Sequence, residues 1–215
     1  MARRKGNTQA TQDQVSEILK ASTLVFGLYG FNGGSLSQIA SHLSIGESGI
    51  LHHFKSKANL LAEVLKYRDQ RIVEVSGLHS NIGLGFVSAW LEMVEFNTSD
   101  PGNVELFCIV SAEATSHSHP AHEYFKARYD RTVRFATESF KVLDDLGYLQ
   151  ENQDPEDLGH SLVALSDGLQ VQWLLDRNLE MLKLHKNFFL RVLTEEASLL
   201  LGLEPSDRAL FAQKS

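Results

Sequence analysis

The sequence has little of what stabilises secreted or fibrous proteins. Its 215 residues include one cysteine, Cys108, which excludes an intrachain disulfide and is typical of the reducing cytosol. Four prolines and 15 glycines exclude a collagen-like chain and proline-rich disorder. No apolar run approaches the roughly 18 residues of a membrane span, and no apolar segment follows the basic N-terminus as in a secretory signal. We therefore expect a cytoplasmic protein that makes no membrane contact.

The chain also lacks an overall positive charge. Its net charge is −7, which by itself argues against a nucleic-acid-binding protein. The charge is unevenly distributed, however, because residues 1–60 carry a net +3 and the remainder −10. This asymmetry arises either by chance within sixty residues or because a small basic module is joined to an acidic body. The sequence pattern must decide between the two explanations.

Apolar residues recur every three or four positions along most of the chain, and no segment alternates as a β-strand does. The fold class is therefore all-α, with about nine helices. Ser35, Ser56 and Asp154 are placed as N-caps and Gly30 as a helix-ending residue, and residues 1–10 read as a flexible polar arm. The predicted helices span residues 11–29, 36–43, 47–54, 57–76, 82–97, 105–114, 121–146, 155–175 and 180–201.

The two short helices at 36–43 and 47–54 have the layout of a helix-turn-helix. They are separated by three residues and preceded by a longer helix, and the second would enter the DNA major groove. Helical hairpins of other folds share this spacing, so the residue types must add specificity.

The segment from Ser35 to Lys57, SLSQIASHLSIGESGILHHFKSK, resembles the DNA-binding signature of the TetR family of transcriptional regulators. The resemblance covers about residues 12–65. Weaker similarity to actinobacterial-type members comes from SAEAT at 111–115 and DGLQVQWLLD at 167–176. The resemblance to the family implies two domains. Residues 1–56 would form an N-terminal arm and a three-helix DNA-binding domain, and residues 57–215 a larger helical effector-binding and dimerisation domain.

Four positions depart from the family pattern, which has a serine cap, a threonine and two tyrosines there. This chain has Gly46, Gly49, Leu51 and His53 instead. Glycine offers no side-chain cap, and glycine inside a helix costs about 1 kcal/mol relative to alanine. DNA affinity would then depend more on Lys57, the N-terminal arm and backbone N–H groups.

The resemblance and the exposed positions of the two short helices define the candidate DNA contacts. Lys57 stands at a helix N-terminus, where the helix dipole disfavours a cation, so a DNA phosphate would explain it better than solvent does. The basic triplet near the N-terminus either reaches an adjacent groove or is a solubilising tail. The candidates are Arg3, Arg4, Lys5, Ser35, Ser37, Gln38, Glu47, Ser48, Gly49, His52, His53 and Lys57.

The resemblance also implies an effector cavity in the C-terminal body. The residues on the helices that would surround it are equally suited to an ordinary core, and the sequence does not separate the two roles. The candidates are Phe86, Trp90, Met93, Val94, Phe107, Ser111, Tyr129 and Trp173.

The last two predicted helices are apolar on more than one side, which indicates burial on more than one side. A second copy of the chain would supply the second contact, and a C2 dimer would present two DNA-binding domains to a palindromic operator. The interface candidates are Leu162, Ala164, Gly168, Val171, Phe188, Val192 and Leu199.

No catalytic motif stands out, so we predict neither an enzyme nor a cofactor. His117, His119, His122 and Glu123 flank Pro120, which favours a polar loop over a metal site. The predicted function is a homodimeric transcriptional repressor released from double-stranded DNA by an unidentified small-molecule effector. The alternative is a ligand- or partner-binding protein of the same fold with weakened DNA binding.

Overall fold

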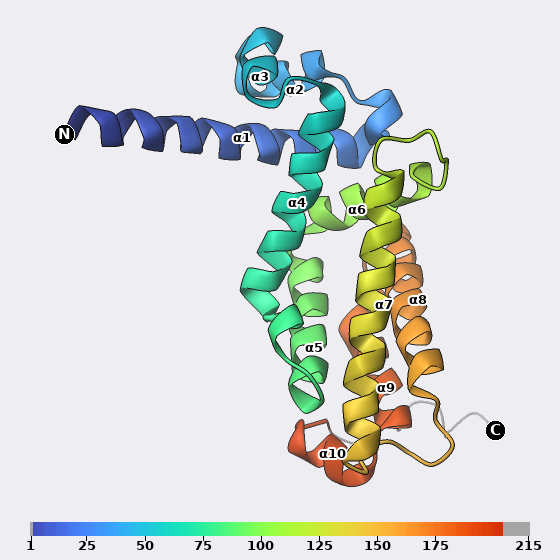
Figure 1. Ribbon diagram of the computed structural model, residues 1–215. Coiled ribbons are helices and arrows are strands. Elements are labelled where there is room, and N and C mark those ends of the chain that lie inside the picture. Colours follow the sequence, from blue (N-terminus) through green and yellow to red (C-terminus); the bar gives the residue numbers. More distant parts are fainter. Residues whose placement is uncertain (1, 204–215) are drawn as a thin grey trace. The chain divides into compact units, whose positions relative to one another are not determined.

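The computed structural model describes the backbone of residues 2–203 and the side chains of residues 12–203 (Figure 1). Over this range the chain is all-α, and an isolated bridge between Leu149 and Leu193 is its one β-type pairing. None of these helices combines the length and apolar character needed to cross a membrane. The helices are α1 (Ala2–Gly33), α2 (Leu36–Leu43), α3 (Glu47–Phe54), α4 (Lys57–Ser76), α5 (Leu84–Ser99), α6 (Pro101–Glu113), α7 (His122–Asp145), α8 (Pro155–Leu175), α9 (Met181–Val192) and α10 (Glu195–Leu200), with a 3-10 turn at Leu78–Ser80.

The first compact unit contains the chain up to Arg71 together with Pro101–Phe125. Its core comes from the inner faces of α1 to α4, with Phe26, Ile39 and Ile50 fully buried. Helix α6 packs along α1, and the backbones approach closely at Gly27, where a Cβ would lie 3.2 Å from the backbone nitrogen of Leu106. A segment distant in sequence thus completes the N-terminal unit.

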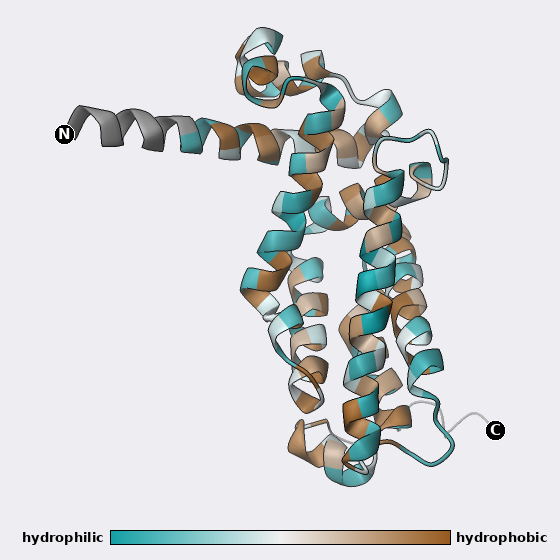
Figure 2. Cartoon of the chain, in the orientation of Figure 1, coloured by the Kyte–Doolittle hydropathy of each residue, from teal (hydrophilic) through white to brown (hydrophobic). Residues whose placement is uncertain are grey.

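The second compact unit contains Ile72–Asp100 and the chain from Lys126 onward. Helix α9 packs against α5 and α8, and the buried Phe86 ring contacts Trp90, Phe135 and Phe140. Hydrophobic residues line α5, whereas the visible face of α7 is largely hydrophilic (Figure 2). This unit therefore has an aromatic core.

The polar N-terminus differs from the predicted flexible arm. Helix α1 begins at Ala2, and residue 11, the predicted start of this helix, lies inside it. Arginine, lysine, glutamine and alanine are good helix formers, and extending an existing helix costs little compared with nucleating one. The predicted end of the helix is confirmed, because Gly30 departs from helical geometry with φ 69°.

Two helix boundaries near the C-terminal body also differ from prediction. Helix α6 begins at Pro101 rather than at residue 105, since proline suits the first turn of a helix. The predicted helix 180–201 is two helices, because Leu193 is extended and pairs with Leu149 while Thr194 caps α10. This break raises the number of α-helices in residues 2–203 to ten.

The predicted division into residues 1–56 and 57–215 stays a prediction, and the compact units group the chain in another way. Helix α4 continues from the first unit into the second, and α6 belongs to the first unit although it lies far along the sequence. The periodicity of single helices contains no information on this pairing of α6 with α1.

Candidate DNA-binding surface and ligand pocket

Helix α2 is held at its start by a reciprocal capping box. The Ser35 hydroxyl accepts a hydrogen bond from the Gln38 backbone N–H at 3.2 Å, and Gln38 Oε1 accepts from the Ser35 N–H at 2.7 Å. Both side chains were predicted to contact DNA. Since Gln38 Oε1 is engaged in the cap, its remaining amide donors are the groups available to a base or phosphate.

Helix α3 presents a polar surface over an apolar anchor. Ile50 and Phe54 are buried in the unit, while Glu47, Ser48 and His52 are exposed. These three exposed residues, with the half-buried Gly49 and His53, were predicted as DNA contacts and lie together on one eight-residue helix. This arrangement is the one that direct readout of a major groove requires.

The start of α3 is capped by backbone alone. Gly46 occupies the N-cap with φ −84° and ψ 151°, and no side chain bonds the first N–H groups. Those N–H groups therefore point outward from the helix start, together with the positive end of the helix dipole, and suit a phosphate. The predicted absence of a side-chain cap is confirmed.

Lys57 begins α4 and is bound within the protein. Its ammonium donates to the carbonyl oxygens of Phe31 at 2.7 Å and Gly34 at 2.9 Å, and it lies 4.4 Å from the centre of the Phe31 ring. These contacts explain a lysine at a helix N-terminus without invoking DNA. An ammonium has three donors and is half-exposed here, so the phosphate contact stays a prediction.

A shallow hollow of about 360 Å³ lies beside α2, where Tyr29 of α1 faces Ser37, Gln38, Ser41 and His42. Tyr29, Ser41 and His42 were absent from the predicted contacts. The spacing of Ser37 and Ser41, four residues apart on an exposed face, was the signal that could have added Ser41.

The side chains of Arg3, Arg4 and Lys5 lie outside the described residues. Their backbone is helical, as part of α1. Their predicted DNA contact stays a prediction.

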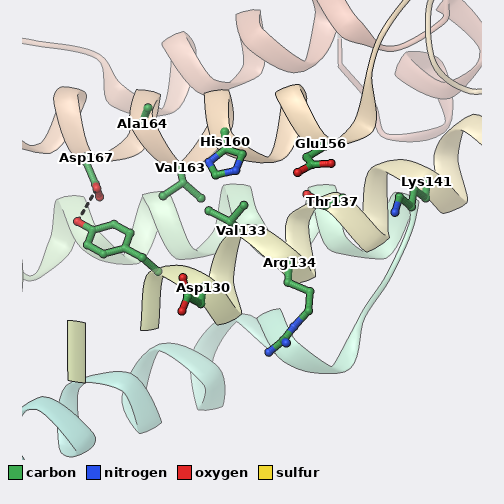
Figure 3. Close-up of a pocket in the computed structure, with 11 residues that line it drawn as sticks. Asp130, Val133, Arg134, Thr137, Lys141, Glu156, His160, Val163, Ala164 and Asp167 are labelled. Carbon is green, nitrogen blue, oxygen red and sulfur yellow. Dashed lines mark hydrogen bonds between the residues drawn. The ribbon is translucent and has the colours of Figure 1, made fainter. Parts of the chain in front are cut away.

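A second candidate site lies between α7 and α8, where a pocket of about 590 Å³ opens on the second unit (Figure 3). Val133, Val163 and Ala164 form its apolar part, Thr137 adds a hydroxyl, and the two helices run side by side along it. Its polar lining residues are Tyr129, Asp130, Arg134, Lys141, Glu156, His160 and Asp167.

Tyr129 is the predicted effector residue that lines this pocket. Its hydroxyl donates to Asp167 Oδ2 at 2.6 Å, which joins α7 to α8 (Figure 3). The pocket carries both signs of charge next to apolar surface, an arrangement suited to a small molecule with polar and apolar parts.

The other predicted effector residues do not line this pocket. Phe86, Trp90, Met93 and Val94 are buried on α5 and Trp173 on α8, while Phe107 is buried and Ser111 half-buried on α6. Phe107 stacks within 4.4 Å of the Arg68 guanidinium, which is itself buried. The alternative role of these residues as ordinary core stays open beside the predicted one.

Several buried polar atoms in the second unit lack a hydrogen-bond partner within the described chain. They are Trp90 Nε1 and Asn97 Oδ1 on α5, Thr137 Oγ1 and Ser139 Oγ on α7, Gln170 Oε1 on α8, and Asn187 Oδ1 on α9. A buried polar group without a partner costs about 1–3 kcal/mol, so each is suited to a polar ligand or a water molecule.

Residues 18–64 match the family model described as bacterial regulatory proteins, tetR family. The match extends from the middle of α1 through α2 and α3 into α4, and so contains the helix-turn-helix. This segment of the chain is therefore a DNA-binding domain of the TetR type. No curated protein matches the chain.

Solved structures of transcriptional regulators share the fold of this chain. A TetR-family regulator from Agrobacterium tumefaciens is 17% identical, covers 85% of this chain and 99% of its own, and superposes with a TM-score of 0.73. A transcriptional regulator from Saccharomonospora viridis, solved in complex with choline, is 23% identical with a TM-score of 0.67 over 85% and 99% of the two chains. NalD of Pseudomonas aeruginosa, the secondary repressor of the MexAB-OprM multidrug efflux pump, is 21% identical with a TM-score of 0.64 over 86% and 98%.

The predicted dimer residues fall into two groups. Ala164, Gly168 and Val171 are exposed along one face of α8, and Leu199 is exposed on α10. Leu162 and Val192 are buried within the chain and Phe188 is half-buried, so these three stabilise the unit itself. Two leucines outside the predicted interface set are also exposed, Leu175 (85% exposed) and Leu200 (60% exposed).

The histidine-rich loop after α6 forms pairs. His117 Nδ1 lies 3.1 Å from His122 Nε2, and His119 Nε2 lies 3.6 Å from Glu113 Oε2. Across residues 12–203, no three His, Cys, Asp or Glu side chains are grouped so that they could hold a metal ion. Glu123 is exposed beside His122.

Proposed function

We propose that this protein is a homodimeric transcriptional repressor of the TetR family that binds palindromic double-stranded DNA and is released by a small-molecule effector. The observation that carries the proposal is helix α3, whose exposed Glu47, Ser48 and His52 lie over the buried anchors Ile50 and Phe54. Such a helix inserts its outer face into a major groove without rearranging its own core.

The DNA-binding part is tested by fluorescence anisotropy with duplexes selected from a random pool by the wild-type protein. Lys57→Ala should weaken binding to all sequences and reduce the slope of log K against log salt by about one unit, since one phosphate contact is lost. Lys66→Ala removes an equal charge from an exposed pair with Glu63 farther along α4 and serves as the control. Absence of any salt-sensitive selected duplex would refute DNA binding.

The homodimer is supported by the apolar face of α8. Val171 and Leu175 are exposed on it, and a Cβ at Gly168 would meet no atom of the described chain within 4 Å. A second copy would cover this surface and place two α3 helices on one palindrome. Val171→Glu should produce monomers in light-scattering chromatography, whereas Leu146→Glu, at an exposed leucine just beyond α7, should leave the dimer intact.

Effector binding is supported by the mixed polar and apolar pocket between α7 and α8 and by the unpartnered buried polar atoms of α5, α8 and α9. An effector releases DNA only if it binds the DNA-incompetent state more tightly than the competent one. A small-molecule screen for release of the selected duplex tests this. For a hit, Asp167→Asn should raise the concentration needed for release, and an unchanged concentration would exclude this pocket.

One observation favours the alternative of weakened DNA binding. The N-cap of α3 lacks a side-chain acceptor, and Gly49 offers no side chain to a phosphate. The same selection experiment decides, because a protein that has lost operator recognition enriches no sequence from the pool.

A further inference from the structure

Glu113, the last residue of α6, binds the backbone of α1 at the point where that helix ends. Its Oε2 accepts a hydrogen bond from the Phe31 N–H at 2.7 Å, and its Oε1 accepts from the Asn32 side-chain amide at 3.1 Å and the Asn32 N–H at 3.3 Å. Bonds to an ionised acceptor are stronger than neutral ones. A residue 82 positions away thus satisfies N–H groups at the end of α1.

Gly30 creates the space for this carboxylate. Its φ of 69° turns successive backbone N–H groups toward one point, which makes a small anion-binding concavity. A Cβ at residue 30 would overlap the carboxylate, with the Glu113 carboxyl carbon only 2.7 Å away. The positive φ favours glycine at this position, and a larger residue would displace the carboxylate.

The opposite side of the same peptide segment binds Lys57. The Phe31 N–H is bound by Glu113, and the Phe31 carbonyl accepts from the Lys57 ammonium at 2.7 Å. His119 closes the cluster, since its ring contacts Phe31 edge-on at 5.2 Å. Because His119 Nδ1 accepts from the Ala121 N–H, the neutral ring carries its proton on Nε2, which faces Glu113.

We infer that Glu113 is a positioning residue for DNA binding, acting through Phe31 on the ammonium of Lys57. The inference rests on the proposed function. Glu113 holds the Phe31 peptide in place, the Phe31 carbonyl orients Lys57, and Lys57 reaches the DNA phosphate. The carboxylate itself touches no DNA.

Neutralising Glu113 should change the affinity for DNA in the direction opposite to the one that simple electrostatics predicts. Removing an acid from a DNA-binding protein reduces repulsion of the phosphates and strengthens binding. If Glu113 positions Lys57, neutralising it should instead weaken binding. The matched control is Glu123, whose side chain is 84% exposed and which follows in the same unit.

The experiment measures affinity for the selected duplex by anisotropy in the full-length protein. Glu113→Gln should weaken binding about tenfold, as expected when a charge-assisted hydrogen bond is lost. Glu123→Gln should leave affinity unchanged or raise it. In a Lys57→Ala background, Glu113→Gln should change affinity less than about twofold, because the group it positions is gone.

Glu113→Asp separates position from charge and replaces Glu113→Gln if the latter does not fold by circular dichroism. It keeps the carboxylate but is one methylene too short, so it should also weaken binding. Gly30→Ala displaces the carboxylate and should act in the same direction. Wild-type affinity retained in the folded Glu113 variants, or full additivity with Lys57→Ala, would overturn the inference while leaving DNA binding intact. Failure of the wild-type protein to select any duplex would instead refute the proposed function.

Discussion

Two glycines three residues apart at the start of α3 should respond oppositely to alanine. Gly49 lies inside the helix, and a Cβ there would meet only Ile45 Cδ1, at 4.0 Å. Gly49→Ala should therefore raise the free energy of unfolding by up to about 1 kcal/mol, because alanine loses less backbone entropy in a helix and creates no overlap.

Gly46 is the N-cap of the same helix, with extended backbone angles. Alanine fits that conformation and the space around it, where the nearest atom is Ser48 Oγ at 3.4 Å. It is nonetheless a poor N-cap residue, so Gly46→Ala should lower the free energy of unfolding by roughly 0.5–1 kcal/mol.

Both variants are compared with the wild type by urea unfolding followed at 222 nm and by thermal unfolding. For a chain of this size, 1 kcal/mol corresponds to about 2–4 °C in Tm. Shifts of opposite sign are expected. Shifts of the same sign, or destabilisation by Gly49→Ala, would show that α3 does not begin at Glu47, and the reasoning about its weak cap would fail.

Three further predictions concern stability. Burial lowers the pKa of the His119 and His185 imidazoles below the usual 6.5, against the attraction of Glu113 at His119 and of the Met181 carbonyl at His185. As the pH falls, these histidines bind protons at a higher pH in the unfolded chain than in the folded one, so the free energy of unfolding should decrease as the pH falls through about 6.5. A free energy of unfolding by urea that stays constant from pH 7.5 to 5.5 would contradict this. Ser35→Ala removes the capping box of α2 and should lower the free energy of unfolding, measured with urea, by about 1 kcal/mol. An unchanged free energy of unfolding would show that another group caps α2. Gly159→Ala should lower Tm, since its Cβ would overlap the Thr137 hydroxyl and lie 3.1 Å from the Thr137 backbone nitrogen, and an unchanged Tm would show that α7 and α8 are not this close.

The helix-turn-helix and the start of α4 could be predicted to the residue. Helices 36–43, 47–54 and 57–76 were expected from apolar spacing and from the caps Ser35 and Ser56, and the structure has these bounds. Ser56 accepts from the Asn59 N–H as an N-cap does. These signals are local, because each depends on residues within one turn of the helix.

The errors arise where distant segments meet. The break at Leu193 has no glycine or proline to mark it, and it depends on pairing with Leu149, 44 positions earlier. The partners of Lys57 were likewise invisible, since Phe31 and Gly34 come close only through the fold. The effector candidates were chosen as apolar positions on helices, whereas the pocket beside α8 is lined mostly by polar residues.

The membership of α6 in the first compact unit limits how regulators of this kind can be recombined. A chimera joined at residue 56 would carry α1 without the helix that lies against Gly27 and without the carboxylate that binds beyond Gly30. The recipient's own α6 would have to supply both a close backbone approach and an acid at its last residue. Exchange of the helix-turn-helix between such proteins therefore depends on a segment that begins 68 residues beyond the end of α1 in sequence.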